Sequence, residues 1–119
     1  MPRFEASALR GYCVSVLTAS GVERSCAEAV ADALIDAELT GVSTHGVSRL
    51  AVYMQRMDAG VMSRENNIRI VRESTSTLVV DAGNSLGAAA AKFAMERCIA
   101  KAKETGCCFA SVHLSLIHI

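Results

Sequence analysis

The sequence predicts an α+β fold, in which a helical N-terminal part is followed by a strand–strand–helix–strand unit. Two observations predict it. Apolar residues recur at helical spacing through the first half, and after residue 62 short strand-like runs replace that pattern. A long helical stretch over 86–105 then separates the second strand candidate from the third. We therefore divide the chain into a helical subdomain over 1–62, an α+β part over 63–113 and a tail over 114–119.

Three helices are expected in the first half. The first spans 4–18, and the second runs from about 23 to 39. The core-facing stripe of the second helix consists of Cys26, Val30, Ala33, Leu34 and Ala37. A third helix should begin near Thr44, with Ser43 or Thr44 as its N-cap, and should end at Gly60. The acidic residues of the second helix most simply form its solvated face; they are Asp32, Asp36 and Glu38.

The second half changes period. Residues 68–72 and 77–80 are strand candidates joined by a polar turn, so they should form a hairpin. The helix over 86–105 should be capped by Asn84 or Ser85 and stopped by Gly106, and its wide apolar face indicates burial against a sheet or a partner subunit. Residues 107–112 are apolar enough for a central strand.

Composition excludes several classes of protein. The 119 residues allow one ordinary domain, and 51% hydrophobic residues are enough for a packed core. Twelve basic and twelve acidic residues give zero net charge, so no electrostatic footprint for nucleic acid is present. No apolar run approaches membrane-spanning length, and no signal peptide is recognisable. The five cysteines lack C-x-x-C spacing, so we expect reduced thiols in a cytoplasmic protein without a metal site.

The stretch over 41–50 carries the candidate chemistry. If a helix starts at Thr44, His45 and Arg49 lie four residues apart on one face, beside unpaired backbone N–H groups. An arginine fork, an imidazole and a hydroxyl together suit a carboxylate, and Gly46 would allow a ligand to approach closely. The same spacing also fits a simple helix cap, a turn histidine and a solvated surface charge. The glycine loop over 83–87 lacks the dinucleotide fingerprint and reads more simply as a capping loop.

These motifs resemble a known family. The run over 31–50, ADALIDAELTGVSTHGVSRL, is similar to the N-terminal signature of the non-Rossmann malate/L-lactate dehydrogenases, with Thr44 where the family usually has Ser. That family includes malate, lactate, sulfolactate and ureidoglycolate dehydrogenases and some imine reductases. The resemblance continues through Tyr53, Gly60, the loop VVDAGNSLG over 79–87 and the helix end KAKETG over 101–106. It covers nearly everything from Phe4 to His113.

The resemblance implies a function. Thr44, His45 and Arg49 would bind a small 2-hydroxy or 2-oxo acid, and hydride would pass between C2 of that acid and NAD or NADP. A general acid/base would exchange the hydroxyl proton. The resemblance also implies a homodimer when the protein is full length, whereas cofactor-binding residues are not assigned.

The tail departs from the family pattern. Ile117 stands where the family has its presumed acid/base His, and His118 is one place late, so no catalytic residue is assigned. The ending over 114–119 resembles translated sequencing adapter; the alternative is a divergent tail that packs as a short apolar strand. We expect an N-terminal fragment of a dehydrogenase, inactive by itself. Two alternatives are a small non-catalytic α+β module that binds an anionic metabolite and a dimerisation module built on the 86–105 helix.

Overall fold

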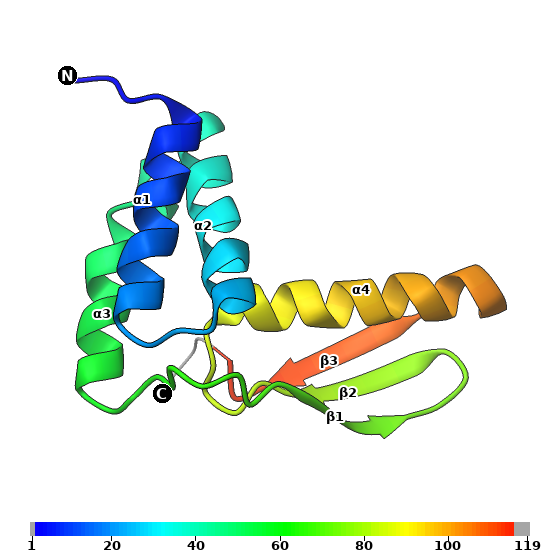
Figure 1. Cartoon of the computed structure of the whole chain (residues 1–119). Helices are drawn as coiled ribbons and strands as arrows, with labels where there is room; N and C mark the ends of the chain where they lie inside the picture. Colours follow the sequence, from blue (N-terminus) through cyan, green and yellow to red (C-terminus); the bar gives the residue numbers. More distant parts are fainter. Residues whose placement is uncertain (1, 116–119) are drawn as a thin grey trace.

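Three helices and a short 3-10 turn precede a hairpin, a long helix and a final strand in the computed structural model, which describes residues 2–115 (Figure 1). The elements in order are α1 (Ala6–Ala19), α2 (Arg24–Leu39), the 3-10 turn η1 (Ser43–His45), α3 (Arg49–Asp58), β1 (Arg69–Glu73), β2 (Thr77–Asp81), α4 (Gly87–Thr105) and β3 (Phe109–His113). The predicted α+β order of helices followed by strand–strand–helix–strand is confirmed.

The N-terminal helices pack around an apolar core. Leu17 of α1 and Val30 and Leu34 of α2 are almost completely buried, and α1 and α2 lie side by side (Figure 1). Cys13 and Cys26 are buried free thiols in this core, as predicted. The inclusion of Ala33 in the core stripe was wrong. Ala33 is exposed, as are Asp32 and Asp36, so it belongs to the polar side of α2.

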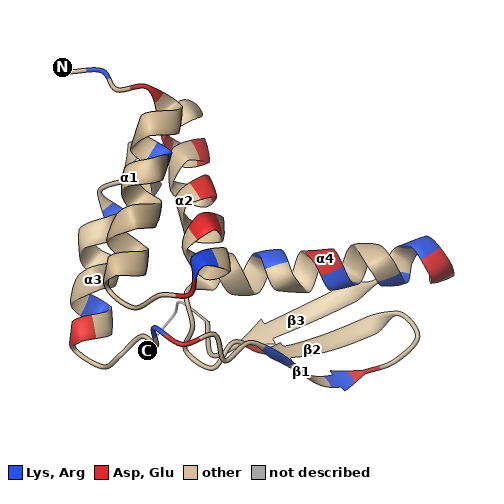
Figure 2. Cartoon of the chain, viewed as in Figure 1, with Lys and Arg blue, Asp and Glu red and all other residues tan. Residues whose placement is uncertain are grey.

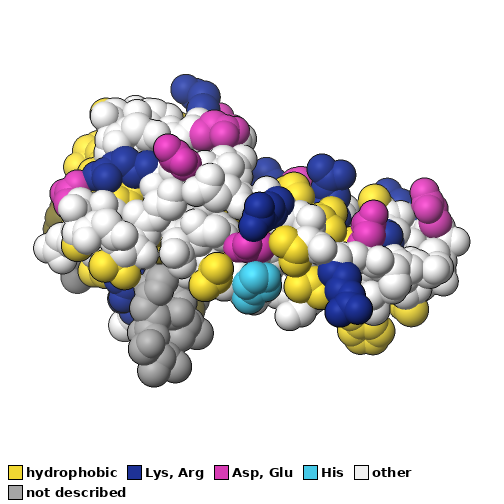
Figure 3. All heavy atoms as spheres, turned by 90° about the horizontal axis from the view of Figure 1, so that it is seen from below, with side chains coloured by type: hydrophobic (Ala, Val, Ile, Leu, Met, Phe, Trp, Pro, Cys, Tyr) yellow, Lys and Arg dark blue, Asp and Glu magenta, His cyan; other side chains and the backbone are white. Residues whose placement is uncertain are grey.

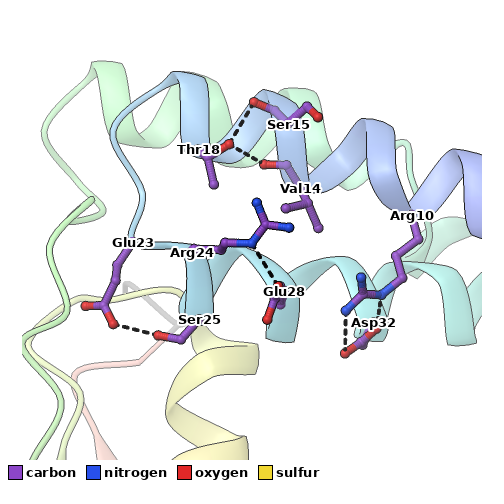
Figure 4. Close-up of polar contacts among 9 residues, drawn as sticks. All are labelled: Arg10, Val14, Ser15, Thr18, Glu23, Arg24, Ser25, Glu28 and Asp32. Atoms are coloured by element: carbon purple, nitrogen blue, oxygen red, sulfur yellow. Dashed lines mark hydrogen bonds and ion pairs between the residues drawn. The ribbon is translucent and has the colours of Figure 1, made fainter.

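The outer surface of the α1–α2 pair carries short polar contacts (Figure 4). The Nε atom of Arg10 lies 2.5 Å from an Asp32 carboxylate oxygen, and this hydrogen bond lowers the pKa of Asp32 below its usual value. Arg24 pairs with Glu28 one turn later at 3.0 Å. Both pairs are solvent-exposed, so each contributes about 0.2–1 kcal/mol to the stability of the fold. Figure 2 shows the acidic residues along one side of α2, which confirms the solvated face for Asp32.

The sheet has the order β1-β2-β3. β1 and β2 form the predicted antiparallel hairpin, with an irregularity at Val71, and β3 runs parallel to β2. The expectation of a central third strand was wrong for this sheet. β2 is the central strand and contributes the buried Leu78 and Val80, whereas β3 lies at an edge and its Phe109 is 72% exposed. Figure 3 views the molecule from below and shows hydrophobic and charged side chains mixed on that face.

Helix α4 crosses from the helical part to the sheet. Its first half is buried through Ala89, Ala90 and Ala94, but Met95 and Ile99 farther along are exposed, so the predicted wide apolar face is only partly covered. Gly106, with φ of 94°, ends the helix as predicted.

The predicted N-caps of α4 were wrong. Leu86 occupies the N-cap position without any side-chain cap. Asn84 adopts a left-handed conformation with φ of 59°. The buried Ser85 hydroxyl instead donates to the Glu65 carbonyl at 3.0 Å and accepts the Asn67 N–H at 3.2 Å. A buried hydroxyl pairs with whichever groups surround it, and here the preceding loop surrounds it.

The fold has two apolar clusters rather than one. The larger joins α1, α2, α3 and the first turn of α4, and the smaller joins Leu78 and Val80 of the sheet to Ala94. Ile68 packs against both clusters. The radius of gyration is 15.2 Å, against about 13.5 Å for a compact domain of this length. The excess reflects the arm formed by α4 and the sheet (Figure 1). Within residues 2–115, no helix combines the length and apolarity needed to cross a membrane.

Candidate functional site

The candidate site lies on the segment that connects α2 to α3. Helix α2 ends at Leu39, and Gly41, with φ of 80°, reverses the chain before the 3-10 turn Ser43–His45. Gly46 then adopts φ −90° and ψ −149°, which is not helical, so α3 starts only at Arg49. The prediction of one helix starting near Thr44 was wrong, and neither Ser43 nor Thr44 caps α3, whose N-cap is Ser48 without a side-chain cap.

The three candidate residues nevertheless lie together around Thr44. The Thr44 hydroxyl oxygen lies 3.0 Å from Nδ1 of His45. The Nε atom of Arg49 donates to the Thr44 carbonyl at 3.0 Å. Thr44 and His45 are exposed and Arg49 is half-buried. The 3-10 turn, rather than a shared helix face, therefore brings the hydroxyl, the imidazole and the guanidinium together.

Glu38 is a member of this site that sequence reasoning missed. One carboxylate oxygen accepts the Val47 N–H at 2.9 Å. A methyl group at Gly46 would lie 2.0 Å from the same oxygen, so the carboxylate occupies the space that Gly46 leaves. Glu38 is exposed, as predicted for the solvated face of α2, but it also accepts the Val47 N–H. The interpretation of Gly46 as an opening for a ligand was wrong, because the carboxylate fills that space. The sequence feature that could have indicated this contact is Gly41, because the chain reversal there folds the following residues back onto the last turn of α2.

The backbone at the start of α3 is already occupied. Besides the Val47 N–H held by Glu38, the Arg49 N–H donates to the Gly46 carbonyl at 3.0 Å and the Leu50 N–H to the Val47 carbonyl at 3.0 Å. The predicted set of free N–H groups beside His45 and Arg49 is thus incorrect for these three amides. In the described residues, the Arg49 guanidinium forms no ion pair. The cationic side chain, and not the helix end, is the group available to an anion.

A second polar cluster lies where β2 and β3 end. Arg69, Asp81 and His113 occupy the same register across the three strands, and Arg69 lies 3.2 Å from the Asp81 carboxylate. The Gly83 N–H and the Arg69 side chain lower the pKa of Asp81, and the nearby His113 contributes. A surface cavity of about 460 Å³ adjoins Arg69 and Asp81. The hairpin register would have revealed the Arg69–Asp81 pair, because opposite residues of an antiparallel pair share a face.

The glycine loop before α4 does not fit a dinucleotide phosphate. A methyl group at Gly83 would lie 2.5 Å from Cβ of Asn67, so that glycine is closed by the chain itself. The Ser85 hydroxyl is engaged by Glu65 and Asn67. Gly83 therefore offers no open space to a dinucleotide phosphate. Residues 2–115 hold no cluster of three potential metal ligands. Ile117 and His118 lie outside the described residues.

Comparison with known proteins agrees with this architecture. The family model described as malate/L-lactate dehydrogenase matches residues 4–118. A malate dehydrogenase from Pyrococcus horikoshii is 39% identical over 98 residues, which are 82% of this chain and 27% of that protein. A malate/(S)-sulfolactate dehydrogenase from Methanothermus fervidus is 32% identical over 104 residues, or 87% of this chain and 31% of that protein.

The fold of this chain also matches that of solved members of the family. The solved structure of the Pyrococcus horikoshii malate dehydrogenase superposes with a TM-score of 0.93 at 34% identity, over 98% of this chain and 33% of that chain. The chain thus spans about a third or less of the length of the relatives it matches. On the family match, its extent and the shared fold, the chain belongs to the malate/L-lactate dehydrogenase family.

Proposed function

We propose that this chain is the N-terminal, substrate-binding part of an NAD- or NADP-dependent dehydrogenase that acts on a small 2-hydroxy acid. The relatives support the class of substrate, because the two curated proteins above are named for malate and for malate and (S)-sulfolactate. Both compounds contain a 2-hydroxycarboxylate. We infer the same group for this protein, and we leave open which acid carries it and which of the two cofactors is used.

The observation that carries the proposal is the grouping of three side chains around Thr44. Arg49 presents a permanent cation that forms no ion pair in residues 2–115, and its fork suits a carboxylate. The His45 imidazole and the Thr44 hydroxyl lie beside each other and can hydrogen-bond a substrate oxygen. Arg49 would therefore hold the carboxylate while His45 and Thr44 orient the oxygen on C2.

The nicotinamide, when bound, would accept or supply the hydride. Because Asn67 closes the space at Gly83, we assign no cofactor residue in the loop over 83–87, nor elsewhere in the described part of the chain. We also assign no acid/base, since Ile117 stands at the expected position. The division into 1–62, 63–113 and 114–119, a homodimeric full-length enzyme and a cytoplasmic location remain parts of this proposal.

The test uses the longest reading frame in which this chain occurs. Oxidation of NADH or NADPH is followed with oxaloacetate and with pyruvate. Arg49→Ala should raise KM, with a loss of about 2–5 kcal/mol if the lost pair is desolvated in the complex. Arg56→Ala is the matched control, because Arg56 lies two turns farther along α3.

Three results decide the proposal. Turnover that needs Arg49 but not Arg56 supports it. An unchanged KM in Arg49→Ala removes Arg49 from the site. Binding of the acids without any turnover would favour a non-catalytic module for anionic metabolites. The 119-residue chain alone should show no turnover, and measured activity would contradict the expectation that it is only part of the enzyme.

A further inference from the structure

Among residues 2–115, Glu38 is the one side chain from outside 42–50 that hydrogen-bonds to the candidate substrate segment over 43–48. It projects from the last turn of α2, and its carboxylate oxygen accepts the Val47 N–H at 2.9 Å. The second attachment is apolar, since Val47 packs against the larger cluster and Leu50 is buried in it.

The segment over 43–49 is otherwise bonded to itself. Arg49 donates to the Thr44 carbonyl, and the Ser48 hydroxyl donates to the Ser43 carbonyl at 3.2 Å. Short backbone bonds add to these, from His45 to the Val42 carbonyl and from Gly46 to the Ser43 carbonyl. Such a segment keeps its internal shape when it moves. Its placement on α2 therefore depends on two attachments: the contact of Glu38 at Val47 and Gly46, and the apolar packing of Val47 and Leu50.

The contact is also electrostatically favourable. The Val47 N–H precedes the ten-residue helix α3 by two residues, and a carboxylate is stabilised near the N-terminus of a helix. The Gly46 backbone gives this carboxylate room, because any larger side chain would collide with it. A neutral amide at position 38 would still offer an oxygen to Val47, whereas a methyl group would offer none.

We propose that Glu38 is a positioning residue for substrate binding, which sets Thr44, His45 and Arg49 relative to the helical part through the Val47 N–H. This inference rests on the proposed function for the role of the three side chains. Its structural part, a held Val47 amide, is independent of that function. Glu38 need not touch the substrate, so its loss should act on substrate binding more than on turnover.

The kinetic test compares Glu38→Ala, Glu38→Gln and Asp36→Ala in the longest reading frame that contains this chain, with oxaloacetate as the substrate. Asp36 is the matched control, because it is an exposed carboxylate near the same end of α2 whose side chain makes no hydrogen bond in the described part. Glu38→Ala should raise KM roughly tenfold, as expected for the loss of a charge-assisted hydrogen bond, and should leave kcat nearly unchanged. Glu38→Gln should restore most of the affinity, and Asp36→Ala should behave as wild type.

The structural test uses amide hydrogen exchange in the 119-residue chain. The Val47 amide should be protected in the wild type and in Glu38→Gln, and should exchange faster in Glu38→Ala. The Gly46 amide, bonded to Ser43, serves as the internal reference. Because this measurement needs no substrate, it decides the positioning contact even if the proposed dehydrogenase activity is absent.

Four outcomes would overturn the inference. An unprotected Val47 amide in the wild type would remove the contact. An unchanged KM in Glu38→Ala would remove its role in binding. An equal loss in Glu38→Gln would show that the charge acts and not the hydrogen bond. Tighter binding of oxaloacetate by Glu38→Ala would mean that the carboxylate competes with the substrate.

Discussion

Replacement of Gly46 by Ala tests the contact between Gly46 and Glu38 directly. The added Cβ would lie 2.0 Å from the carboxylate oxygen, 2.5 Å from Cδ and 2.8 Å from Cγ of Glu38. The φ of Gly46 is −90°, outside the left-handed region, and the atoms that the added Cβ meets all belong to the Glu38 side chain. Because the colliding atoms are the end of a flexible side chain, Glu38 should swing away and release the Val47 N–H.

The magnitude follows from what is released. A hydrogen bond to a charged group contributes about 1.5–3 kcal/mol. Glu38 is exposed, so water can take the place of its carboxylate at the Val47 N–H, which reduces the loss. We therefore expect Gly46→Ala to lower the free energy of unfolding by about 1–2 kcal/mol. In a Glu38→Ala background the collision and the bond are both absent. There the same substitution should cost less than about 0.5 kcal/mol.

The assay is urea unfolding of the four proteins of this cycle, followed by far-UV circular dichroism, since the chain has no Trp. Gly11→Ala on α1 is the control, because nothing lies within 4 Å of the added methyl group. It should stabilise the helix by about 0.5–1 kcal/mol. An equal cost of Gly46→Ala in both backgrounds, or no cost in either, would refute the steric and hydrogen-bonding argument.

Two further predictions concern titrating groups. The pKa of the Cys108 thiol is raised, chiefly by burial and next by the neighbouring Cys98 thiol. Iodoacetamide at mildly alkaline pH should therefore alkylate the exposed Cys107 faster than Cys108, and peptide mass spectrometry would measure the two rates. Equal rates would contradict this. The pKa of Asp81 is lowered in the folded state by its hydrogen bonds, so its contribution to stability is complete above the unfolded value of about 3.9 and is lost as the pH falls through the lowered folded pKa. In Asp81→Asn, the urea concentration at the midpoint of unfolding should therefore depend less on pH between about pH 2 and 5 than in the wild type. The same pH dependence in both proteins would argue against this role of Asp81.

The order of elements was predictable because it depends on local periodicity. The buried Val30 and Leu34 recur at helical spacing in α2, and the paired runs around the Ser74 turn have strand character. Gly106 likewise stops α4 where a left-handed residue is required. These signals lie within a few residues of the element they define, and sequence reasoning therefore found them.

The start of α3 and the cap of α4 depend on distant partners. Glu38 lies nine residues before Val47, and Ser85 lies 18 residues after Asn67. The helix-capping propensity of Thr44 or Ser85 carries no information about such distant contacts, so both residues were predicted as N-caps. The edge position of β3 depends in the same way on which strands flank it in space. Thr44, His45 and Arg49 could be proposed from their closeness in sequence, whereas the contact between Glu38 and Val47 could not.

The two apolar clusters imply that the sheet and the helical part unfold locally one after the other rather than together. The sheet cluster has three buried members, whereas the helical cluster is several times larger, and Ile68 bridges them. Under mild denaturing stress the strands should therefore exchange their amides before α1 and α2 do. Residues 43–49 are anchored through Val47 and Leu50 to the larger cluster. A molecule whose sheet has come apart would thus still present Thr44, His45 and Arg49 in their folded arrangement.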